Sequence, residues 1–433
     1  MKKKIVYVGL SADILHKGHV NILKIASSYG DVYVGLLTDK AIASYKNIPY
    51  LDYEKRKVVL ENIKYVKKVI PQKTLDYVEN LNKIKPDFVV HGNDWKHGIQ
   101  KKTRERVIKI LKKWSGKLIE PRYTMDISST LIKKEIESVI SLPENRVSRL
   151  KRLIDLKDIV RILESHNSLT GLIIEKINIT KNKKTIEFDG MWSSSLTDSA
   201  TKGLPDNSSL SFSARMSSLD FMMDVTTKPL VFDADNAGLI EHLPFLVRSL
   251  ERLGTSAIIV EDKVGLKKNS LFKNQAGSKQ DKPKLFAKKI KKICNSRQSQ
   301  DFMVIARIES FILGKGLKDA LHRAVIYSKA GADAILIHSK EKTPSEIFSF
   351  AKEFRKSKHF IPLVSVPSTY SKVYEKDLIR NGFKLVIYAN QLLRAAIPAM
   401  QNTAKTILKN KRAFEADKKI ISIKDIINLI KND

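Results

Sequence analysis

The chain has a single cysteine, Cys294, among its 433 residues. One thiol excludes an internal disulfide framework and a cluster of thiolate metal ligands, and it fits a reducing compartment, so we expect a cytoplasmic protein. No stretch reaches the roughly 18 consecutive apolar residues that a membrane-spanning helix needs. The apolar run in the opening MKKKIVYVGL is too short for a signal peptide, and no small-residue cleavage site follows it. We therefore expect neither a membrane span nor a secretory leader.

Acidic residues are also scarce: 46 Asp and Glu stand against 79 Lys and Arg, which gives a formal net charge of +33. Such an excess is typical of nucleic-acid binders, and this class stays open as an alternative. The lysines, however, are spread along nearly the whole chain, and no basic motif is interleaved with aromatic residues. This distribution favours small anionic substrates over nucleic acid.

The first part of the chain alternates apolar strands with helix-patterned segments. IVYVGL, DVYVGLL and DFVVHG are β-branched and bounded by Gly or Asp, while VNILKIASSYG and TLDYVENLNKIK carry helical spacing. This is the pattern of a Rossmann-like α/β domain with a parallel sheet. A polar, charged segment, SLPENRVSRLKR, follows at residues 141–152. We therefore predict two domains, 1–140 and 141–433.

The second part contains eight strand-like segments separated mostly by helical patterns. They are GLIIEK, GMWSSSL, KPLVFDAD, SAIIVEDK, DFMVIARIES, ADAILIHSK, IPLVSVPS and FKLVIYAN. Eight units over about 280 residues match a (β/α)₈ barrel of the TIM type in number and length. The fold class predicted for the chain is therefore α/β: a Rossmann-like domain followed by a barrel.

A pair of histidines, His16 and His19, follows the first predicted strand, in GLSADILHKGHVNIL. They lie at the start of a predicted helix, where unpaired backbone N–H groups and the helix dipole favour an anion. Gly18 between them removes a side chain where a phosphate must approach closely. Two imidazoles at such a site can stabilise the charge that builds on a pentavalent phosphorus.

Residues 4–136 resemble the cytidylyltransferase branch of the HxGH nucleotidyltransferases. The resemblance rests on HKGH, on YKNIPYLDYEKR at 45–56, on VVHGNDW at 89–95 and on ISSTLIKKEI at 127–136. It implies transfer of CMP from CTP with Mg²⁺, and it implies roles for the following residues: His16, His19 and Lys46 in catalysis, and Gly9, Gly18, Asp94, Ser128, Ser129 and Thr130 in binding the nucleotide. The chain departs from the family pattern at GLSAD, where GxFD is usual. It also departs at residues 122–124, where the family often has an arginine directly before the threonine and this chain has Tyr123 between Arg122 and Thr124. These departures affect the acceptor more than the nucleotidyl chemistry.

Polar residues gather at the predicted strand ends of the second part. Asp233 and Asp235 end one strand and Glu261 ends the next, and three carboxylates from neighbouring strands suit Mg²⁺. Arg307 and His338 end the two strands after that, and they offer an anion-binding fork and a ring that forms hydrogen bonds. Because the carboxyl ends of barrel strands form the catalytic face, we expect these residues to share one site.

Residues 148–428 resemble the phosphoenolpyruvate mutase/isocitrate lyase superfamily, and the mutase in particular. EDKVGLKKNS at 261–270 matches the mutase signature EDKx₅NS, whereas lyases carry a cysteine in this loop. The resemblance implies that Asp233 binds Mg²⁺ directly and that Asp235 and Glu261 hold metal-bound waters. The other implied residues are Trp192, Ser194, Ser195 and Leu196 for the pyruvyl group, Arg307 and His338 for the phosphoryl group, and Lys267, Asn269 and Ser270 on a closing loop beside Asp206.

Together the two resemblances imply a bifunctional enzyme of phosphonate biosynthesis. One domain would convert phosphoenolpyruvate to phosphonopyruvate, and the other would join CMP to a phosphonate or a related phosphate ester. A phosphonopyruvate hydrolase or a C–C lyase in the barrel, and an adenylyltransferase in the first domain, stay open as alternatives. We expect a homo-oligomer.

Overall fold

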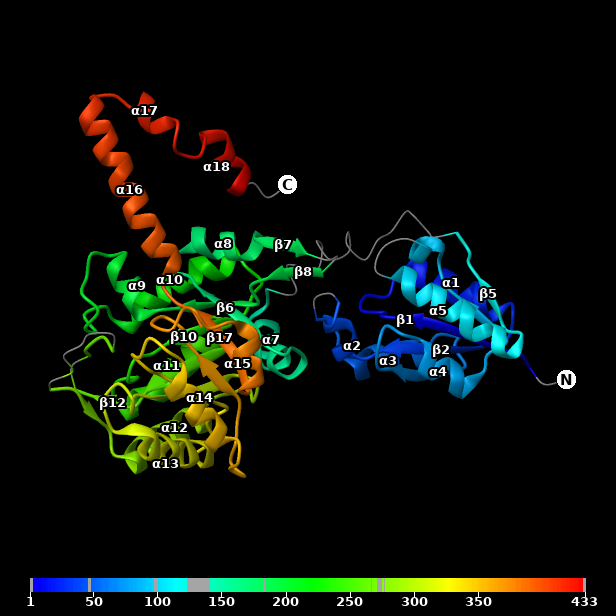
Figure 1. Cartoon of the computed structure of the whole chain (residues 1–433), viewed down its shortest axis with the longest axis horizontal. Helices are drawn as coiled ribbons and strands as arrows, with labels where there is room; N and C mark the ends of the chain where they lie inside the picture. The colour runs from blue at the N-terminus through cyan, green and yellow to red at the C-terminus, as the bar shows by residue number, and fades with distance from the viewer. Residues whose placement is uncertain are drawn as a thin grey trace.

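The computed structural model describes residues 3–45, 48–96, 100–122, 141–181, 184–265, 267–270, 275 and 277–430. Two bodies are visible: one built on an open sheet near the N-terminus and one built on a closed barrel (Figure 1). Each has its own apolar core. The fold class predicted from the sequence is confirmed.

The first body contains a five-stranded parallel sheet in the order β3-β2-β1-β4-β5. Its strands are β1 (Ile5–Leu10), β2 (Asp31–Leu37), β3 (Lys68–Gln72), β4 (Phe88–Val90) and β5 (Lys117–Ile119), and its helices are α1 (Lys17–Ser27), α2 (Asp39–Ala43), α3 (Tyr53–Glu61), α4 (Val78–Ile84) and α5 (Lys101–Leu111). The predicted strands IVYVGL, DVYVGLL and DFVVHG correspond to β1, β2 and β4. The edge strands β3 and β5 were not predicted, because KVIPQ contains a proline and KLI is only three residues long.

The second body is a closed barrel of eight parallel strands. In chain order these are β6 (Val160–Glu164), β9 (Gly190–Ser193), β10 (Leu230–Asp233), β11 (Ala257–Glu261), β14 (Met303–Ile308), β15 (Ala334–Ile337), β16 (Leu363–Ser365) and β17 (Phe383–Tyr388). Every one of these strands except the first lies in a segment predicted to be a strand.

The predicted first barrel strand, GLIIEK, is wrong, because these residues belong to helix α8 (Ser168–Lys176). The side chain of Asn167 caps this helix, and Asn167 and Thr170 form a reciprocal capping box. A capping box satisfies two backbone N–H groups that a helix start leaves without partners, so it favours the helix over a strand. The first strand instead comes from VRILE, directly before it.

Helices surround the barrel and close one of its ends. The outer ones are α8, α10 (Phe212–Asp224), α11 (Leu243–Arg252), α12 (Pro283–Ser296), α13 (Gly316–Lys329), α14 (Ser345–Phe354) and α15 (Glu375–Arg380). Helix α7 (Pro143–Leu156) packs Leu150, Leu153 and Ile154 against the apolar interior of the barrel. Ile48, from the first body, belongs to the same apolar cluster, so α7 lies between the two bodies.

The last three helices project from the barrel, and the chain turns back after the first of them, so that the carbonyl oxygen of Leu429 accepts a hydrogen bond from Lys176 of α8 (Figure 1). They are α16 (Gln391–Asn410), α17 (Phe414–Asp417) and α18 (Ile423–Ile430), and neither α16 nor α18 contains a buried residue. Leu408 and Ile423 are each 78% exposed. Among the described residues, no helix combines the length and apolarity that crossing a membrane requires.

Gly190, the first residue of β9, allows the close packing of neighbouring strands. A Cβ at this position would lie 2.7 Å from the carbonyl oxygen of Pro229 and 2.7 Å from Ile162. We predict that Gly190→Ala lowers the free energy of unfolding by about 1–3 kcal/mol, since a backbone oxygen cannot move aside. Urea denaturation measures the change.

Gly171→Ala is the matched control for this substitution. Gly171 lies in α8, and a Cβ there would meet its nearest neighbour, Met191, at an ordinary 3.5 Å. An alanine inside a helix should stabilise the chain by up to about 1 kcal/mol. Equal effects of the two substitutions would contradict the packing assigned to Gly190.

Candidate functional site

A cavity of about 220 Å³ lies at the carboxyl end of β1, beside the start of α1. It is lined by the predicted catalytic residues His16 and His19 and by the predicted binding residues Gly9, Gly18 and Asp94, and Arg122 also lines it. A side chain at Gly9 would collide with the ring of Tyr77, because a Cβ there would lie 2.3 Å from it. Glycine therefore keeps this wall of the cavity open.

The two predicted histidines face each other across the start of α1. Their ring centroids are 4.1 Å apart, and His16 is the residue that caps the helix. The backbone N–H of Gly18 donates to Nδ1 of His16 (3.1 Å). This bond requires an unprotonated Nδ1, so the neutral ring carries its proton on Nε2 and can donate it to an anion. Burial lowers the pKa of His16, which favours this neutral form at pH 7.

Aromatic rings form another part of this site. His91, which lines the cavity, stacks on Trp95 with ring centroids 3.9 Å apart and planes 5° from parallel. Trp95 Nε1 donates to Glu120 (2.7 Å), and Arg104 donates twice to the same carboxylate (2.7 and 2.8 Å). A flat, fixed ring surface of this kind can stack on a nucleotide base.

The remaining predicted nucleotide ligands, Lys46, Ser128, Ser129 and Thr130, lie outside the described residues. Their roles stay predictions.

The pH dependence of stability tests whether the Glu120 carboxylate holds the Trp95 ring in place. Its hydrogen bonds from Arg104 lower the pKa of Glu120 from 4.5 to about 2. Because the folded pKa lies below the unfolded one, this stabilisation is complete above about pH 4.5 and is lost as the pH falls towards 2. We predict that Glu120→Gln destabilises the chain by about 1–3 kcal/mol near pH 7 and by progressively less below pH 4.5. Urea denaturation at a series of pH values measures this.

Glu79→Gln is the control for Glu120→Gln. Glu79 also pairs with a cation, Lys83, but its side chain is 55% exposed, so little change is expected at any pH. A destabilisation by Glu120→Gln that does not vary between pH 7 and pH 3 would contradict the pairing with Arg104.

A second cavity, of about 60 Å³, lies at the carboxyl ends of the barrel strands. Asp233 and Glu261 are the last residues of β10 and β11, Arg307 lies next to the end of β14, and His338 follows β15. The predicted residues that line this cavity are Trp192, Ser194, Ser195, Leu196, Asp206, Asp233, Glu261, Lys267, Asn269, Ser270, Arg307 and His338. Of the residues predicted for the barrel site, Asp235 alone is not in the lining, but it contacts Lys267.

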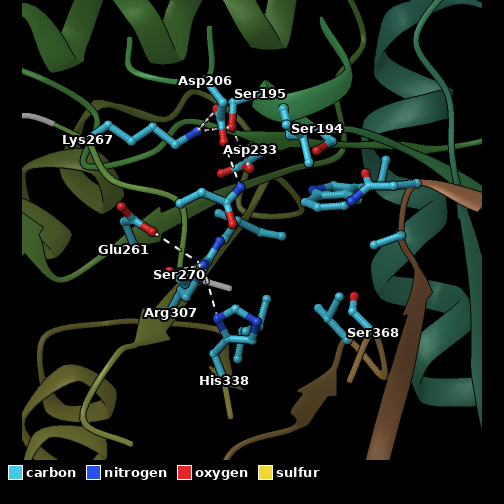
Figure 2. A pocket seen from close by; sticks show the side chains of 18 of the residues that line it. Ser194, Ser195, Asp206, Asp233, Glu261, Lys267, Ser270, Arg307, His338 and Ser368 are labelled. Carbon is cyan, nitrogen blue, oxygen red and sulfur yellow. Dashed lines mark hydrogen bonds and ion pairs between the residues drawn. The ribbon is translucent and has the colours of Figure 1, made fainter. Parts of the chain in front are cut away.

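Lys267 forms the centre of one cluster of charges in this cavity (Figure 2). Its Nζ lies 2.5 Å from a carboxylate oxygen of Asp206 and 2.5 Å from one of Asp235, and it also donates to Ser195 Oγ. Asn269 Nδ2 donates to the other oxygen of Asp206 (2.8 Å). These contacts hold the 267–270 segment over the strand ends.

Arg307 forms the centre of a second cluster (Figure 2). Its guanidinium donates to Glu309 (2.6 Å) and to Ser270 Oγ (3.0 Å), and it lies 3.4 Å from Glu261. Nδ1 of His338 lies 3.1 Å from both Arg307 Nη2 and Glu309 Oε1. Arg307 is thus fixed in place beside a ring that can donate or accept a hydrogen bond.

Burial and neighbouring charges shift several pKa values here in opposite directions. Burial lowers the pKa of Lys267, but the Asp235 and Asp233 carboxylates outweigh it, so the pKa lies above its ordinary value and the ammonium stays charged. Burial raises the pKa of Glu261 to about 8, and Arg307 only partly opposes it. Burial, with the adjacent Arg307 charge, lowers the pKa of His338, so this ring is neutral at pH 7.

The carboxylates at the ends of β10 and β11 suit a hard divalent cation. Asp233, Asp235 and Glu261 are all buried, and carboxylate oxygens are the ligands that Mg²⁺ prefers. In the part of the chain that the structure describes, however, no three His, Cys, Asp or Glu side chains are grouped closely enough to hold a metal ion. The ammonium of Lys267 supplies positive charge among these acids instead. The donor chemistry fits Mg²⁺, and the ligand set stays a prediction.

The sequence reasoning missed several residues that support the barrel site. Glu309 positions both Arg307 and His338, and its place two residues after Arg307, on the same face of the chain, was a signal for it. Lys263 donates to Ser270 Oγ (2.8 Å) and lies within the quoted EDK motif. Arg215, from the distant helix α10, donates to the carbonyl oxygen of Asp233 (2.5 Å), and no local pattern indicated it.

Comparison with known protein families gives two matches along the chain. Residues 150–408 match the family described as phosphoenolpyruvate phosphomutase. Residues 7–135 match the family described as cytidylyltransferase-like.

Individual relatives agree with these matches. The phosphoenolpyruvate phosphomutase of Tetrahymena pyriformis is 36% identical over 286 residues, which are 66% of this chain and 91% of the relative. The glycerol-3-phosphate cytidylyltransferase of Bacillus spizizenii is 35% identical over 141 residues, which are 32% of this chain and all of the relative. Among solved structures, phosphonopyruvate hydrolase in complex with oxalate and Mg²⁺ is 31% identical with a TM-score of 0.58, and the match covers 66% of this chain and 94% of that one.

Proposed function

Since the chain belongs to the phosphoenolpyruvate phosphomutase family and carries a member of the cytidylyltransferase family ahead of it, we propose that it catalyses two reactions. The barrel would interconvert phosphoenolpyruvate and phosphonopyruvate, and the first domain would transfer CMP from CTP to a phosphonate or phosphate ester. The observation that carries the proposal is the gathering of Lys267, Arg307 and His338 around the carboxylates at the barrel strand ends. We propose the domains 1–140 and 141–433.

The barrel site has side chains suited to both the pyruvyl end and the phosphoryl end of the substrate. Trp192 and Ser194, with the backbone amides of Ser195 and Leu196, would line the pyruvyl group. Arg307 would bind the phosphoryl oxygens, because its guanidinium already lies in the cavity and Glu309 fixes its orientation. The neutral His338 would donate a hydrogen bond to the oxygen that bridges carbon and phosphorus.

Mg²⁺, when bound, would neutralise the negative charge of the pyruvate enolate. Asp233 would hold it directly, and Asp235 and Glu261 would act through water, as the resemblance implies. Lys267 pairs with Asp235, so its ammonium lies beside the carboxylates that would hold the metal.

Water must be kept from a phosphoryl group in transit, and the 267–270 segment is placed to exclude it. Asn269 and Lys267 both bind Asp206 across the opening, and Ser270 is buried. A closed, dry site favours transfer of phosphorus between oxygen and carbon over hydrolysis. This supports the mutase.

Phosphonopyruvate hydrolysis is the second candidate, because a hydrolase is among the relatives with the same fold. Cys294 offers no support for a lyase, since its thiol donates to Gly331 from helix α12 and does not line the cavity.

In the first domain, His16 and His19 would stabilise the α-phosphate of CTP as the acceptor oxygen attacks in line and pyrophosphate leaves. The positive end of the α1 dipole would favour the same anion. Asp94 and the stacked His91 lie where the nucleotide base would bind. Mg²⁺ would shield the triphosphate here as well.

The two reactions together suggest a role in phosphonate biosynthesis. The barrel product contains a C–P bond, and a phosphonate derived from it is an oxygen nucleophile suited to accept CMP. The excess of positive charge suits ligands that are all small anions, and we propose no nucleic-acid partner. A cytoplasmic location stays a prediction.

Substitution of one residue in each site tests the independence of the two reactions. We predict that His19→Ala lowers CTP-dependent pyrophosphate release by at least about 100-fold and leaves phosphoenolpyruvate formation from phosphonopyruvate unchanged. Asp233→Ala should do the reverse. Both rates are measured on the full chain with Mg²⁺.

His242→Ala and Asp220→Ala are the matched controls, because they remove the same side chains from exposed positions. Neither should change either rate. Loss of both activities in His19→Ala or in Asp233→Ala would contradict two independent sites.

We also propose that the chain forms a homo-oligomer through its last helices. The apolar side chains of α16 and α18 are exposed in a single copy, and a second copy could cover them. We predict that the double variant Leu408→Asp, Ile423→Asp is smaller than the wild type in light scattering after size exclusion. Phe221→Asp, on α10, replaces another exposed apolar residue and should leave the size unchanged. A monomeric wild type would refute this proposal.

A further inference from the structure

Two successive peptide groups of the 48–51 segment lie between opposite charges from the two domains. Arg152, on α7, donates to the carbonyl oxygens of Pro49 (2.9 Å) and Tyr50 (3.1 Å). On the other side of the same peptide groups, the N–H of Tyr50 donates to Asp13 Oδ1 (2.7 Å) and that of Leu51 lies 3.3 Å from it. Each peptide group thus has its positive N–H end at the carboxylate of Asp13 and its negative carbonyl end at the guanidinium of Arg152, and charge at both ends strengthens both sets of bonds.

The carboxylate at one end of this arrangement lies in the turn that leads to the nucleotide site. Asp13 is buried and lies three residues before His16, in the turn that leads from β1 to α1. Arg56 holds the same turn, since its guanidinium donates to the carbonyl oxygen of Ser11 (2.5 Å) and to that of Leu51 (3.0 Å). The position of the turn before His16 therefore depends on the 48–51 segment.

The 48–51 segment has few other supports on the side of the barrel. Ile48 packs into the apolar cluster of Leu150, Leu153 and Ile154, but the segment also borders a cavity of about 290 Å³. Arg149, one turn before Arg152, lines the same cavity and makes no hydrogen bond to the segment through its Nε. Beside this cavity, Arg152 provides a directional contact to the segment.

We propose that Arg152, a residue of the mutase barrel, is a positioning residue for the nucleotidyl site. It fixes the 48–51 segment, the segment fixes Asp13, and Asp13 fixes the turn that presents His16 at the start of α1. The barrel thereby completes the nucleotide site of its neighbour without touching the nucleotide. The expected effect on CTP binding rests on the proposed nucleotidyl transfer, whereas the expected effect on the turn before His16 does not.

Arg152→Ala in the full chain tests the inference, with Arg149→Ala as the matched control. Arg149 has the same charge on the same helix and borders the same cavity, but its loss removes no bond to Pro49 or Tyr50. We expect Arg152→Ala to speed hydrogen exchange at the amides of residues 13–20 and to weaken binding of CTP with Mg²⁺ about tenfold in calorimetry. Arg149→Ala should change both by less than about twofold.

Two further measurements separate positioning from a loss of folding. Phosphoenolpyruvate formation by the barrel should be unchanged in Arg152→Ala, and Arg152→Lys should recover part of the CTP affinity, because an ammonium can still reach one of the two carbonyl oxygens. Exchange at residues 13–20 that equals the wild type in Arg152→Ala would overturn the inference, and so would an equal loss of mutase activity. If the wild type itself does not bind CTP, the proposed nucleotidyl function fails, while the exchange comparison still decides the role of Arg152.

Discussion

Paired charges buried in a small pocket are the feature on which the proposed chemistry of the barrel depends. Lys267 and Arg307 would each be unstable if buried alone, and Lys267 is held by Asp235 whereas Arg307 is held by Glu261 and Glu309. This pairing keeps two cations fixed in a small cavity, where an anion meets them with little screening from water. Because Glu261 and Asp235 tend to take up protons on burial, the site has a deficit of positive charge that a divalent cation would correct.

The two domains offer different groups for binding an anion. The barrel uses charged side chains that are balanced by other side chains. The first domain uses the start of α1, where the positive end of the helix dipole, the neutral His16 ring and the adjacent His19 ring face the cavity. The peptide groups between Asp13 and Arg152 link the two domains, because a barrel residue supports the turn that leads to the two histidines.

The sequence predicted the residues of the barrel site better than it predicted some of the strands and the long-range contacts. Asp233, Glu261 and Arg307 could be grouped because parallel strands in a barrel bring their carboxyl ends to one face. GLIIEK was assigned wrongly because a short apolar run has no period that separates a strand from a buried helix, and the capping box at Asn167 was overlooked. Arg215 and Arg152 could not be predicted, since their partners are distant in sequence and depend on how the elements pack.

The central claim is that the closed barrel site moves phosphorus between oxygen and carbon and keeps water out. ³¹P NMR of the purified chain with phosphonopyruvate and Mg²⁺ tests it most directly, because the substrate, phosphoenolpyruvate and inorganic phosphate give separate signals. We expect the phosphonopyruvate signal to be replaced by that of phosphoenolpyruvate, with no matching rise in inorganic phosphate. Inorganic phosphate that appears as fast as phosphonopyruvate is lost, with no phosphoenolpyruvate, would contradict the account.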